Sequence, residues 1–382
     1  MIPCQRDAFD IPDDVAYFNC AYMTPMLKAV RRAGEAAMAR VGQPWQVSSD
    51  DFFAPPERAR ALFARLIHAR PDDIAIVPAA SYGISTAARN LRLGKGQVIL
   101  LLDEEFPSNV YAWHALARRD GGEIRMIRRP ADADWTAAIL NALDDRVAIA
   151  ALPHCHWTDG GYVDLARISP ALQHRGARLV LDVTQSLGVL PLDVTRIKID
   201  YLACAAYKWL LGPYSLGFLY AAEQHHGGEP LDYNWITREG SENFAGLVDY
   251  RDGYQPGARR FDMGERASFL LIPMLIAALE QLLAWTPEAI TTTLAGITGQ
   301  IADRAAELGV TVVPDALRAK HLLGLRFPDG PPHGLVEQLR AQNIFVSVRG
   351  QTMRVAPHLF TSATDIDRLV GALRASARSR AT

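Results

Sequence analysis

The sequence predicts an α/β fold, with a largely parallel, doubly wound sheet in one large domain and a smaller α+β domain after it. Between Pro71 and Tyr220, short apolar runs alternate with amphipathic stretches of helix length, an alternation that is typical of parallel sheets. The runs are apolar at nearly every position, which indicates strands covered on both faces. Beyond Tyr220 the chain becomes irregular and then continues with longer helices and further β-like segments, so a second unit is expected there.

The individual elements follow from the hydrophobic pattern. Short apolar runs predict strands at 74–77, 98–102, 124–127, 148–152, 179–181 and 200–205. Amphipathic stretches between them predict helices at 81–91, 110–119, 135–143 and 165–174. In the second unit we expect helices at 267–285, 287–308 and 364–377, and β-like segments at 310–313, 322–326 and 344–348.

Length and composition limit the classes of function. A chain of 382 residues suggests about two domains. An apolar fraction of 49% with 21% charged residues is typical of a globular protein. The 40 basic residues are balanced by 42 acidic ones. The chain therefore has no excess of positive charge that would attract nucleic acid or an anionic membrane. No nucleic-acid or membrane partner is therefore expected.

Cysteine usage and the apolar segments bear on the location of the protein. The four cysteines show no C-x-x-C spacing and form no disulfide framework, so a reducing cytoplasm is expected. The N-terminus lacks the basic flank and apolar stretch of a signal peptide. The most apolar segment, 267–284, carries Pro273 and Glu280 and has helical periodicity, which favours a buried helix over a membrane span.

Two strand ends carry the most informative pair of residues. The apolar run that ends at Leu181 delivers Asp182, and the run that ends at Ala205 is followed closely by Lys208. In neighbouring parallel strands both side chains would emerge at the same edge of the sheet, where open α/β folds bind ligands. A lysine and a carboxylate held on one cofactor are the pairing that pyridoxal phosphate chemistry requires. The pair therefore predicts an enzyme.

The residues around this pair resemble the class V aminotransferase family of pyridoxal phosphate enzymes, which includes cysteine desulfurases, kynureninases and isopenicillin N epimerase. The resemblance is carried by two motifs, Asp182-x-x-Gln185 and Tyr207-Lys208-Trp209-Leu-x-Gly212-Pro213. It covers nearly the whole chain, from Tyr17 to His358.

The resemblance implies a fold and an assembly. The fold is the type I fold of aspartate aminotransferase, with a mostly parallel, doubly wound seven-stranded sheet in the large domain and a smaller α+β domain. The large cofactor-binding domain is expected at 16–260, and the small domain at 261–382 together with 1–15. The active unit is expected to be a homodimer with shared active sites.

The resemblance also implies roles for four residues. Lys208 would form the Schiff base (aldimine) with pyridoxal phosphate, and its freed amine would remove the Cα proton of an amino substrate. Asp182 would pair with the pyridine nitrogen and keep the ring an electron sink. Gln185 would reach the phenolic oxygen of the ring. Arg354 would bind the substrate α-carboxylate, for which its planar fork is suited.

Further residues are expected to hold the cofactor. Ser81 and Tyr82 follow a predicted strand and open a helix, whose N–H groups and positive end suit a phosphate; the resemblance assigns the cofactor phosphate to this turn. Position 205 is alanine where many relatives carry a phosphate-binding serine, so the Tyr207 hydroxyl is expected to rebuild part of that contact. Phe106 corresponds to the residue that stacks on the pyridine ring.

His154, Cys155 and His156 raise the alternative of a metal site. Their alternating spacing in a loop with no further ligand cluster is unlike a zinc site, so no metal is expected. His156 is instead predicted to contact the substrate as a proton relay. The resemblance adds Asn19 to the substrate-binding residues.

Asp182 and Lys208 do not determine which reaction step follows the deprotonation of Cα. Amino-group transfer is the first expectation, from the breadth of the family, and β-elimination, including C–S cleavage, and epimerisation are the alternatives. Desulfurases of this family use a cysteine shortly before the carboxylate-binding arginine, and here no cysteine follows Cys204, so persulfide-forming desulfuration is not expected. A scaffold that binds the cofactor without turnover would have lost Lys208, Asp182 or Arg354, and all three are present.

Overall fold

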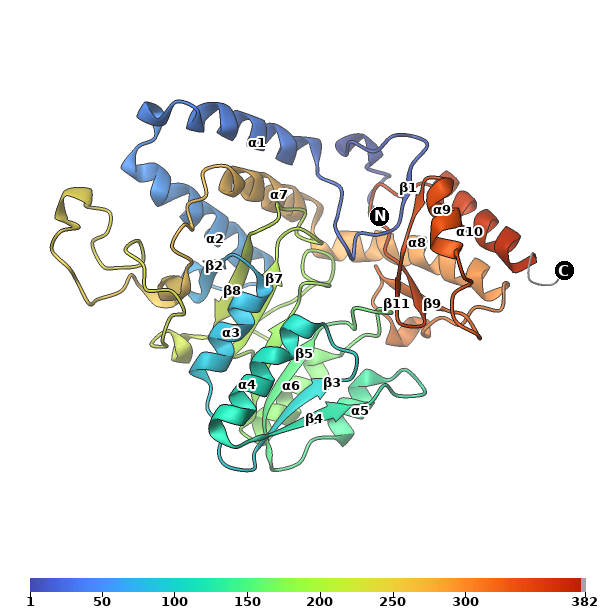
Figure 1. Cartoon of the computed structure of the whole chain (residues 1–382), viewed down its shortest axis with the longest axis horizontal. Coiled ribbons are helices and arrows are strands. Elements are labelled where there is room, and N and C mark those ends of the chain that lie inside the picture. The colour runs from blue at the N-terminus through green and yellow to red at the C-terminus, as the bar shows by residue number, and fades with distance from the viewer. Residues whose placement is uncertain (379–382) are drawn as a thin grey trace.

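The computed structural model describes residues 1–378, and its largest feature in this part of the chain is a seven-stranded sheet (Figure 1). Neighbouring strands are parallel except at β8, which is antiparallel to both β2 and β7. In their order across the sheet the strands are β2 (Ile74–Val77), β8 (Gly217–Ala221), β7 (Tyr201–Ala205), β6 (Arg178–Asp182), β5 (Val147–Pro153), β3 (Val98–Leu102) and β4 (Glu123–Ile127). The predicted doubly wound, mostly parallel sheet is thereby confirmed.

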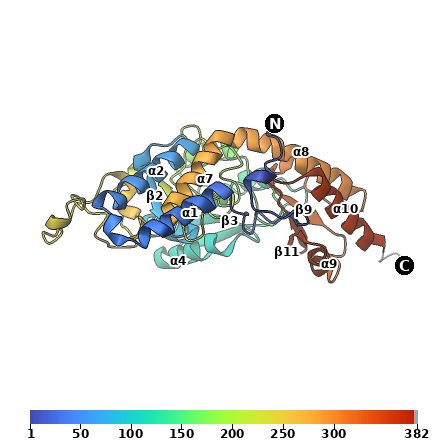
Figure 2. The same ribbon diagram turned by 90° about the horizontal axis from the view of Figure 1, so that it is seen from above.

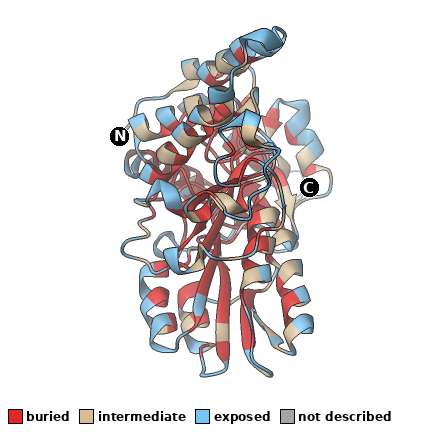
Figure 3. Ribbon diagram, turned by 90° about the vertical axis from the view of Figure 1, so that its left-hand side faces the viewer, coloured by how far each residue is buried: buried red, intermediate tan, exposed pale blue. Residues whose placement is uncertain are grey.

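Helices cover both faces of the sheet, which explains why its strands are apolar, except for the edge strand β4, which carries Glu123 and Arg125. In β3, Ile99 and Leu101 belong to one hydrophobic core, whereas Val98, Leu100 and Leu102 belong to a second core on the opposite face. Successive side chains of a strand point to opposite faces, so a strand between two helix layers buries every residue. Figure 3 shows the strands as the buried centre of the large domain.

Helices form the two covering layers. One layer is α3 (Ala80–Asn90) and α4 (Tyr111–Asp120). The other layer is α2 (Ala54–Leu66), α5 (Trp135–Asn141), α6 (Leu165–His174) and α7 (Leu271–Trp285), with α1 (Lys28–Val41) packed on α7. No described helix combines the length and the apolar character that crossing a membrane requires.

A second, smaller unit is built from the C-terminal part of the chain and the N-terminal residues (Figures 1 and 2). It contains an antiparallel sheet in the order β11 (Ser347–Arg349), β12 (Thr352–Val355) and β9 (Leu323–Arg326), and a parallel pair of β1 (Ala16–Tyr17) with β10 (Ile344–Phe345). Its helices are α8 (Pro287–Ala306), α9 (Leu335–Ala341) and α10 (Ala363–Arg378).

The division into domains at 16–260 and at 261–382 with 1–15 stays a prediction. Helix α7, which follows residue 260, packs on α1 and α2 of the large sheet's outer layer, and residues 379–382 lie outside the described residues. Of the expected β-like segments, 310–313 forms only a bridge between Thr311 and Arg326, and 344–348 is divided between β10 and β11.

A buried ionic network lies behind β2 and supports that strand. The carboxylate of Asp262 accepts hydrogen bonds from Arg60 Nη2 at 2.7 Å, from Arg266 Nη1 at 2.6 Å and from the backbone N–H of Ile76 at 2.6 Å. Arg60, Asp262 and Arg266 are fully buried. The network therefore anchors the segment before α7 to β2, whose end continues into the start of α3.

Candidate active site

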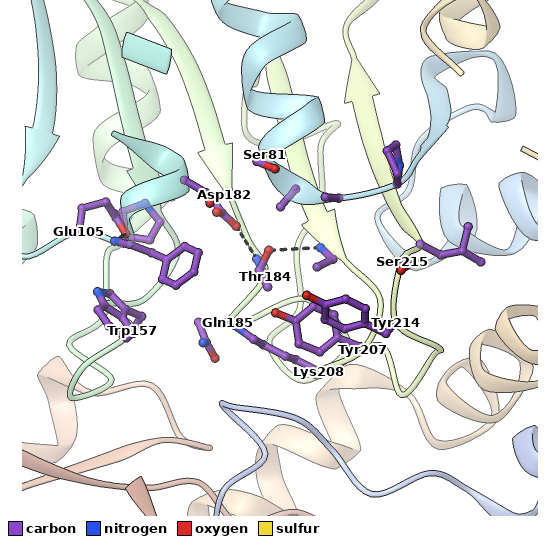
Figure 4. A pocket seen from close by; sticks show the side chains of 18 of the residues that line it. Ser81, Glu105, Trp157, Asp182, Thr184, Gln185, Tyr207, Lys208, Tyr214 and Ser215 are labelled. Atoms are coloured by element: carbon purple, nitrogen blue, oxygen red, sulfur yellow. Dashed lines mark hydrogen bonds between the residues drawn. The ribbon is translucent and has the colours of Figure 1, made fainter. Parts of the chain in front are cut away.

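A cavity of about 360 Å³ opens at the carboxyl ends of β5, β6 and β7 (Figure 4). Asp182 is the last residue of β6, and Lys208 follows the end of β7. Since β6 and β7 are neighbouring parallel strands, both side chains reach the same edge of the sheet, as predicted. The polar residues of the wall are Ser81, Glu105, Ser108, Cys155, Trp157, Asp182, Thr184, Gln185, Tyr207, Lys208, Tyr214 and Ser215.

The amine of Lys208 is available for chemistry. Lys208 is only 6% exposed, and no hydrogen bond or ion pair joins its Nζ to any described residue. Nζ lies 5.4 Å from the ring centroid of Phe106 and 5.5 Å from that of Tyr207. Burial lowers the pKa of Lys208 to about 8, although the charge of Asp182 opposes the shift. A substantial fraction of the amine is therefore neutral near physiological pH.

The carboxylate of Asp182 faces the cavity with capacity for a further partner. Its Oδ1 accepts a hydrogen bond from the backbone N–H of Thr184 at 3.0 Å. Burial raises the pKa of Asp182, and the hydrogen bonds from Thr184 and the charge of Lys208 oppose the shift. A cationic partner at the free oxygen would stabilise the ionised form, which is what the predicted pairing with a ring nitrogen requires.

Gln185 lines the same cavity but is held by its neighbours. Its Nε2 donates to the carbonyl of Ala21 at 2.9 Å, and its Oε1 accepts from Trp209 Nε1 at 3.0 Å. One amide hydrogen is left for another acceptor. The predicted contact of Gln185 with a phenolic ring oxygen stays a prediction.

The other end of the cavity is built by the start of α3. Ser81 lies in the first turn, and the N-cap residue Ala79 provides no side-chain cap, so the N–H groups of Ala80 and Ser81 lack a helical partner. The N–H of Tyr82 donates to the carbonyl of Ala79 at 3.1 Å. Tyr207 lines the wall and packs on Tyr214 at 4.6 Å between ring centroids. The predicted cofactor residue Tyr82 does not line the cavity. Its side chain packs against the hydrophobic core beneath α3 instead, and its hydroxyl has no partner among the described residues.

Aromatic rings form a third wall. Phe106 packs edge-to-face on Trp157 with a centroid distance of 5.4 Å, and Trp157 Nε1 donates to the carbonyl of Glu104 at 2.6 Å. The buried carboxyl of Glu105 also lines the cavity, and burial raises its pKa to about 8. Glu105 Oε1 accepts from the N–H of Phe106, and Oε2 has no partner among the described residues.

Arg354 approaches the cavity from the small unit. It is 1% exposed, and its Nη1 donates to the carbonyl of Trp157 at 3.1 Å. Its Nε has no partner in the described part of the chain. Asn19, in a bridge with Ala356, is near in the fold but is not a wall residue, and its Oδ1 also lacks a described partner.

The structure does not bring His156 to the cavity. Its ring is fully buried and stacks on Trp135 at 5.0 Å between centroids. Nε2 lies 3.0 Å from the carbonyl of Asp103, and Nδ1 lies 2.8 Å from Thr158 Oγ1. With both ring nitrogens engaged inside the protein, the predicted substrate contact of His156 has no support in this geometry. Among the described residues no cluster of His, Cys, Asp and Glu has the arrangement of a metal site.

The family model for class V aminotransferases matches residues 27–381, a span that holds every predicted site residue except Asn19. The chain belongs to this family. The resemblance stated from the motifs is confirmed, and with it pyridoxal phosphate as the cofactor.

Individual relatives agree with this membership. Isopenicillin N epimerase of Streptomyces clavuligerus is 29% identical, over 83% of this chain and 83% of the relative. A solved C-DES mutant with glycine covalently linked to its PLP cofactor has a TM-score of 0.88 at 23% identity, and covers 97% of this chain and 98% of its own. An apo cysteine desulfurase from Thermococcus onnurineus NA1 has a TM-score of 0.86 at 19% identity, with 99% of each chain covered. At these identities the structures show the fold, and they confirm the predicted type I fold.

Three residues of the cavity wall, Thr184, Tyr214 and Ser215, were not predicted from the sequence. Thr184 links Asp182 to the end of β7. Its backbone N–H donates to Asp182, and its Oγ1 accepts a hydrogen bond from the backbone N–H of Ala205 at 3.2 Å. Its position between the two motif residues Asp182 and Gln185 is a usable signal. Tyr214 and Ser215 follow the lysine motif and carry no distinctive spacing, so only the fold reveals that they face the cavity.

The lowered pKa of Lys208 gives a pH prediction for the class V enzyme. We expect the reaction of Lys208 with pyridoxal phosphate to rise with pH around a midpoint near 8, because only the neutral amine reacts with an aldehyde. A lysine at its ordinary pKa would instead give a midpoint of about 10.4. The measurement is the initial rate of incorporation into cofactor-free protein, trapped with borohydride and followed by mass spectrometry.

The charge of Asp182 supplies a matched test of this pH profile. Because Asp182 raises the pKa of Lys208, the substitution Asp182→Asn is expected to move the midpoint to lower pH. A midpoint of about 10 in the wild type, or one that rises in the variant, would show that Lys208 is not buried beside this carboxylate.

Proposed function

We propose that this chain is a pyridoxal phosphate enzyme that removes the Cα proton of an amino acid, and that its reaction is amino-group transfer. The observation that carries the proposal is Lys208. It is the one buried residue among the five lysines of the chain, and it shares a cavity with the buried carboxylate of Asp182. A buried amine with no protein partner is costly for a fold to keep unless it has a chemical use.

The cavity fits the cofactor at each of its polar ends. Asp182 offers a carboxylate oxygen to a protonated ring nitrogen, and the uncapped start of α3 at Ser81 offers N–H groups to a phosphate. Phe106 presents a ring in the wall of the same cavity. When bound, the cofactor supplies an electron sink for the charge left at Cα.

The protein's own residues would bind, orient and deprotonate the substrate. The unpaired part of the Arg354 guanidinium receives the α-carboxylate, while its bond to the Trp157 carbonyl fixes the fork in place. The neutral amine of Lys208 takes the Cα proton. The rings of Phe106 and Trp157 give this side of the cavity an apolar surface.

Elimination, including C–S cleavage, and epimerisation are the alternative reactions for the same residues. Persulfide formation on an enzyme cysteine is disfavoured by the wall itself. Cys155 is the cysteine that lines the cavity, but it is fully buried, burial raises the pKa of its thiol, and its Sγ contacts the carbonyl of Gln185 at 3.4 Å. A thiol in that setting is a poor nucleophile.

The non-enzyme alternative is a scaffold that binds the cofactor without turnover.

Two further expectations accompany the proposal. A homodimer with shared active sites and a cytoplasmic location were expected from the sequence, and both stay predictions. The arm formed by residues 237–254, which extends from the large unit in Figures 1 and 2, carries Val248 and Tyr250 with 78% and 97% of their surface exposed. Exposed apolar side chains on such an arm favour a protein partner.

A panel of amino acids tests the reaction. The purified enzyme is mixed with each amino acid, cofactor absorbance is followed, and products are identified. Amino-group transfer predicts conversion of the cofactor to pyridoxamine phosphate with release of the matching oxo acid. Release of pyruvate or sulfide without that conversion would replace the proposal by a lyase, and loss of chirality alone would replace it by an epimerase.

A further inference from the structure

A second arginine stands beside Arg354 on the same face of the small sheet. In the pairing of β11 with β12, Ser347 lies opposite Arg354 and Arg349 lies opposite Thr352. Residues paired across an antiparallel sheet share a face, as do alternate residues along a strand. Arg349 and Arg354 are therefore diagonal neighbours on one face.

This face packs directly against the loop that closes the cavity. Gly324 of β9 lies opposite Arg354, and a Cβ at Gly324 would come within 2.4 Å of the Asp159 side chain. The close approach brings both arginines to Trp157, a wall residue. The Cζ of Arg349 lies 5.7 Å from the Trp157 ring centroid, and the Cζ of Arg354 lies 5.8 Å from it.

Neither guanidinium is neutralised by the protein. Among the described residues, no carboxylate forms an ion pair with Arg349 or Arg354. Within the same part of the chain, the one hydrogen bond of the Arg349 side chain runs from its Nη1 to the carbonyl of Val348 at 2.7 Å. Burial, and then the charge of Arg349, lowers the pKa of Arg354 to about 9. Two like charges held near one another without acids are costly unless a ligand brings the opposite charge.

We propose that Arg349 binds a second carboxylate, on the side chain of the substrate, so that the enzyme selects amino acids with two carboxylates. This inference rests on the proposed function, in which Arg354 takes the α-carboxylate. The cofactor phosphate does not compete for Arg349, since Ser81 and Ser215 lie on the far side of the cavity from Trp157 (Figure 4). Trp157 is the wall residue that both guanidinium groups approach, and its ring gives each of them a cation–π contact.

The test compares glutarate with butyrate, two acids that lack an amino group and so cannot react. Calorimetry on the full-length holoenzyme is expected to show that glutarate binds at least about tenfold more tightly than butyrate. Arg349→Gln should weaken glutarate binding by about 10- to 100-fold and leave butyrate binding within about twofold. Arg349→Lys, which keeps the charge but not the fork, should give an intermediate value for glutarate.

The controls separate this inference from the proposed function and from misfolding. Arg340→Gln alters an exposed arginine of the same unit and should leave the affinities for glutarate and butyrate unchanged. Arg354→Gln should weaken the binding of both acids. Equal binding of the two acids by the wild type, or equal loss of both in Arg349→Gln, would overturn the inference. Borohydride labelling of Lys208 in the same samples reports on the proposed function independently, because it does not require a dicarboxylate.

Discussion

Replacing Lys208 by alanine is expected to lower kcat by at least about 100- to 10,000-fold, the range that loss of a general base costs. No other amine takes its place, since the remaining lysines, Lys28, Lys95, Lys198 and Lys320, are not buried and do not line the cavity. The measurement is steady-state turnover of the best substrate from the amino acid panel, with enzyme saturated in pyridoxal phosphate.

The control for this substitution is Lys198→Ala, which removes an exposed lysine of the same domain and should leave kcat unchanged. Thermal unfolding should show that Lys208→Ala is folded, with a melting temperature equal to or above that of the wild type, because a buried amine with a lowered pKa opposes folding. A folded Lys208→Ala variant that keeps more than about a tenth of the activity would contradict the assigned role.

Replacing Asp262 by alanine is expected to lower the free energy of unfolding by about 3–5 kcal/mol. The substitution leaves the guanidinium groups of Arg60 and Arg266 fully buried without their carboxylate, and removes an acceptor for the N–H of Ile76. Urea denaturation monitored by fluorescence measures the loss. Since Ile76 lies in the strand that leads to the start of α3, a weaker affinity for pyridoxal phosphate should accompany it.

Asp10→Ala is the matched control for the buried network. Asp10 also pairs with two basic residues, Lys28 and Arg31, but all three side chains are at least 40% exposed, and exposed pairs contribute about 0–1 kcal/mol. A loss in Asp262→Ala no larger than that in Asp10→Ala would show that the buried network does not hold β2 in place.

The sequence was sufficient for the parallel strands and insufficient for the strand that is antiparallel. Strands β2, β3, β5, β6 and β7 are apolar because helices cover both faces, and that burial is visible in composition alone. The edge strand β4 carries Glu123 and Arg125 and is largely unburied. Strand β8, also apolar, lies between β2 and β7, and no local pattern specifies its two partners or its direction. The helices α1 and α2 lie outside the expected elements, although their amphipathic patterns carry the signal.

The site shows the same division between local and tertiary information. Asp182, Gln185 and Lys208 could be placed together because two neighbouring parallel strands fix where their ends lie. His156 could not, because a loop residue can turn inward or outward, and here the Trp135 ring and the Thr158 hydroxyl hold it away from the cavity. Arg349 has no sequence motif of its own, and only the register of β11 with β12 aligns it with Arg354.

The central claim is that Lys208 is the lysine that holds pyridoxal phosphate, and peptide mapping after borohydride reduction tests it most directly. Purified full-length protein saturated with the cofactor is reduced, digested and analysed by mass spectrometry. The expected result is a phosphopyridoxyl group on Lys208 alone, with the other lysines unmodified and no label in Lys208→Ala. A protein that retains no label, or that carries it on another lysine, would contradict the account.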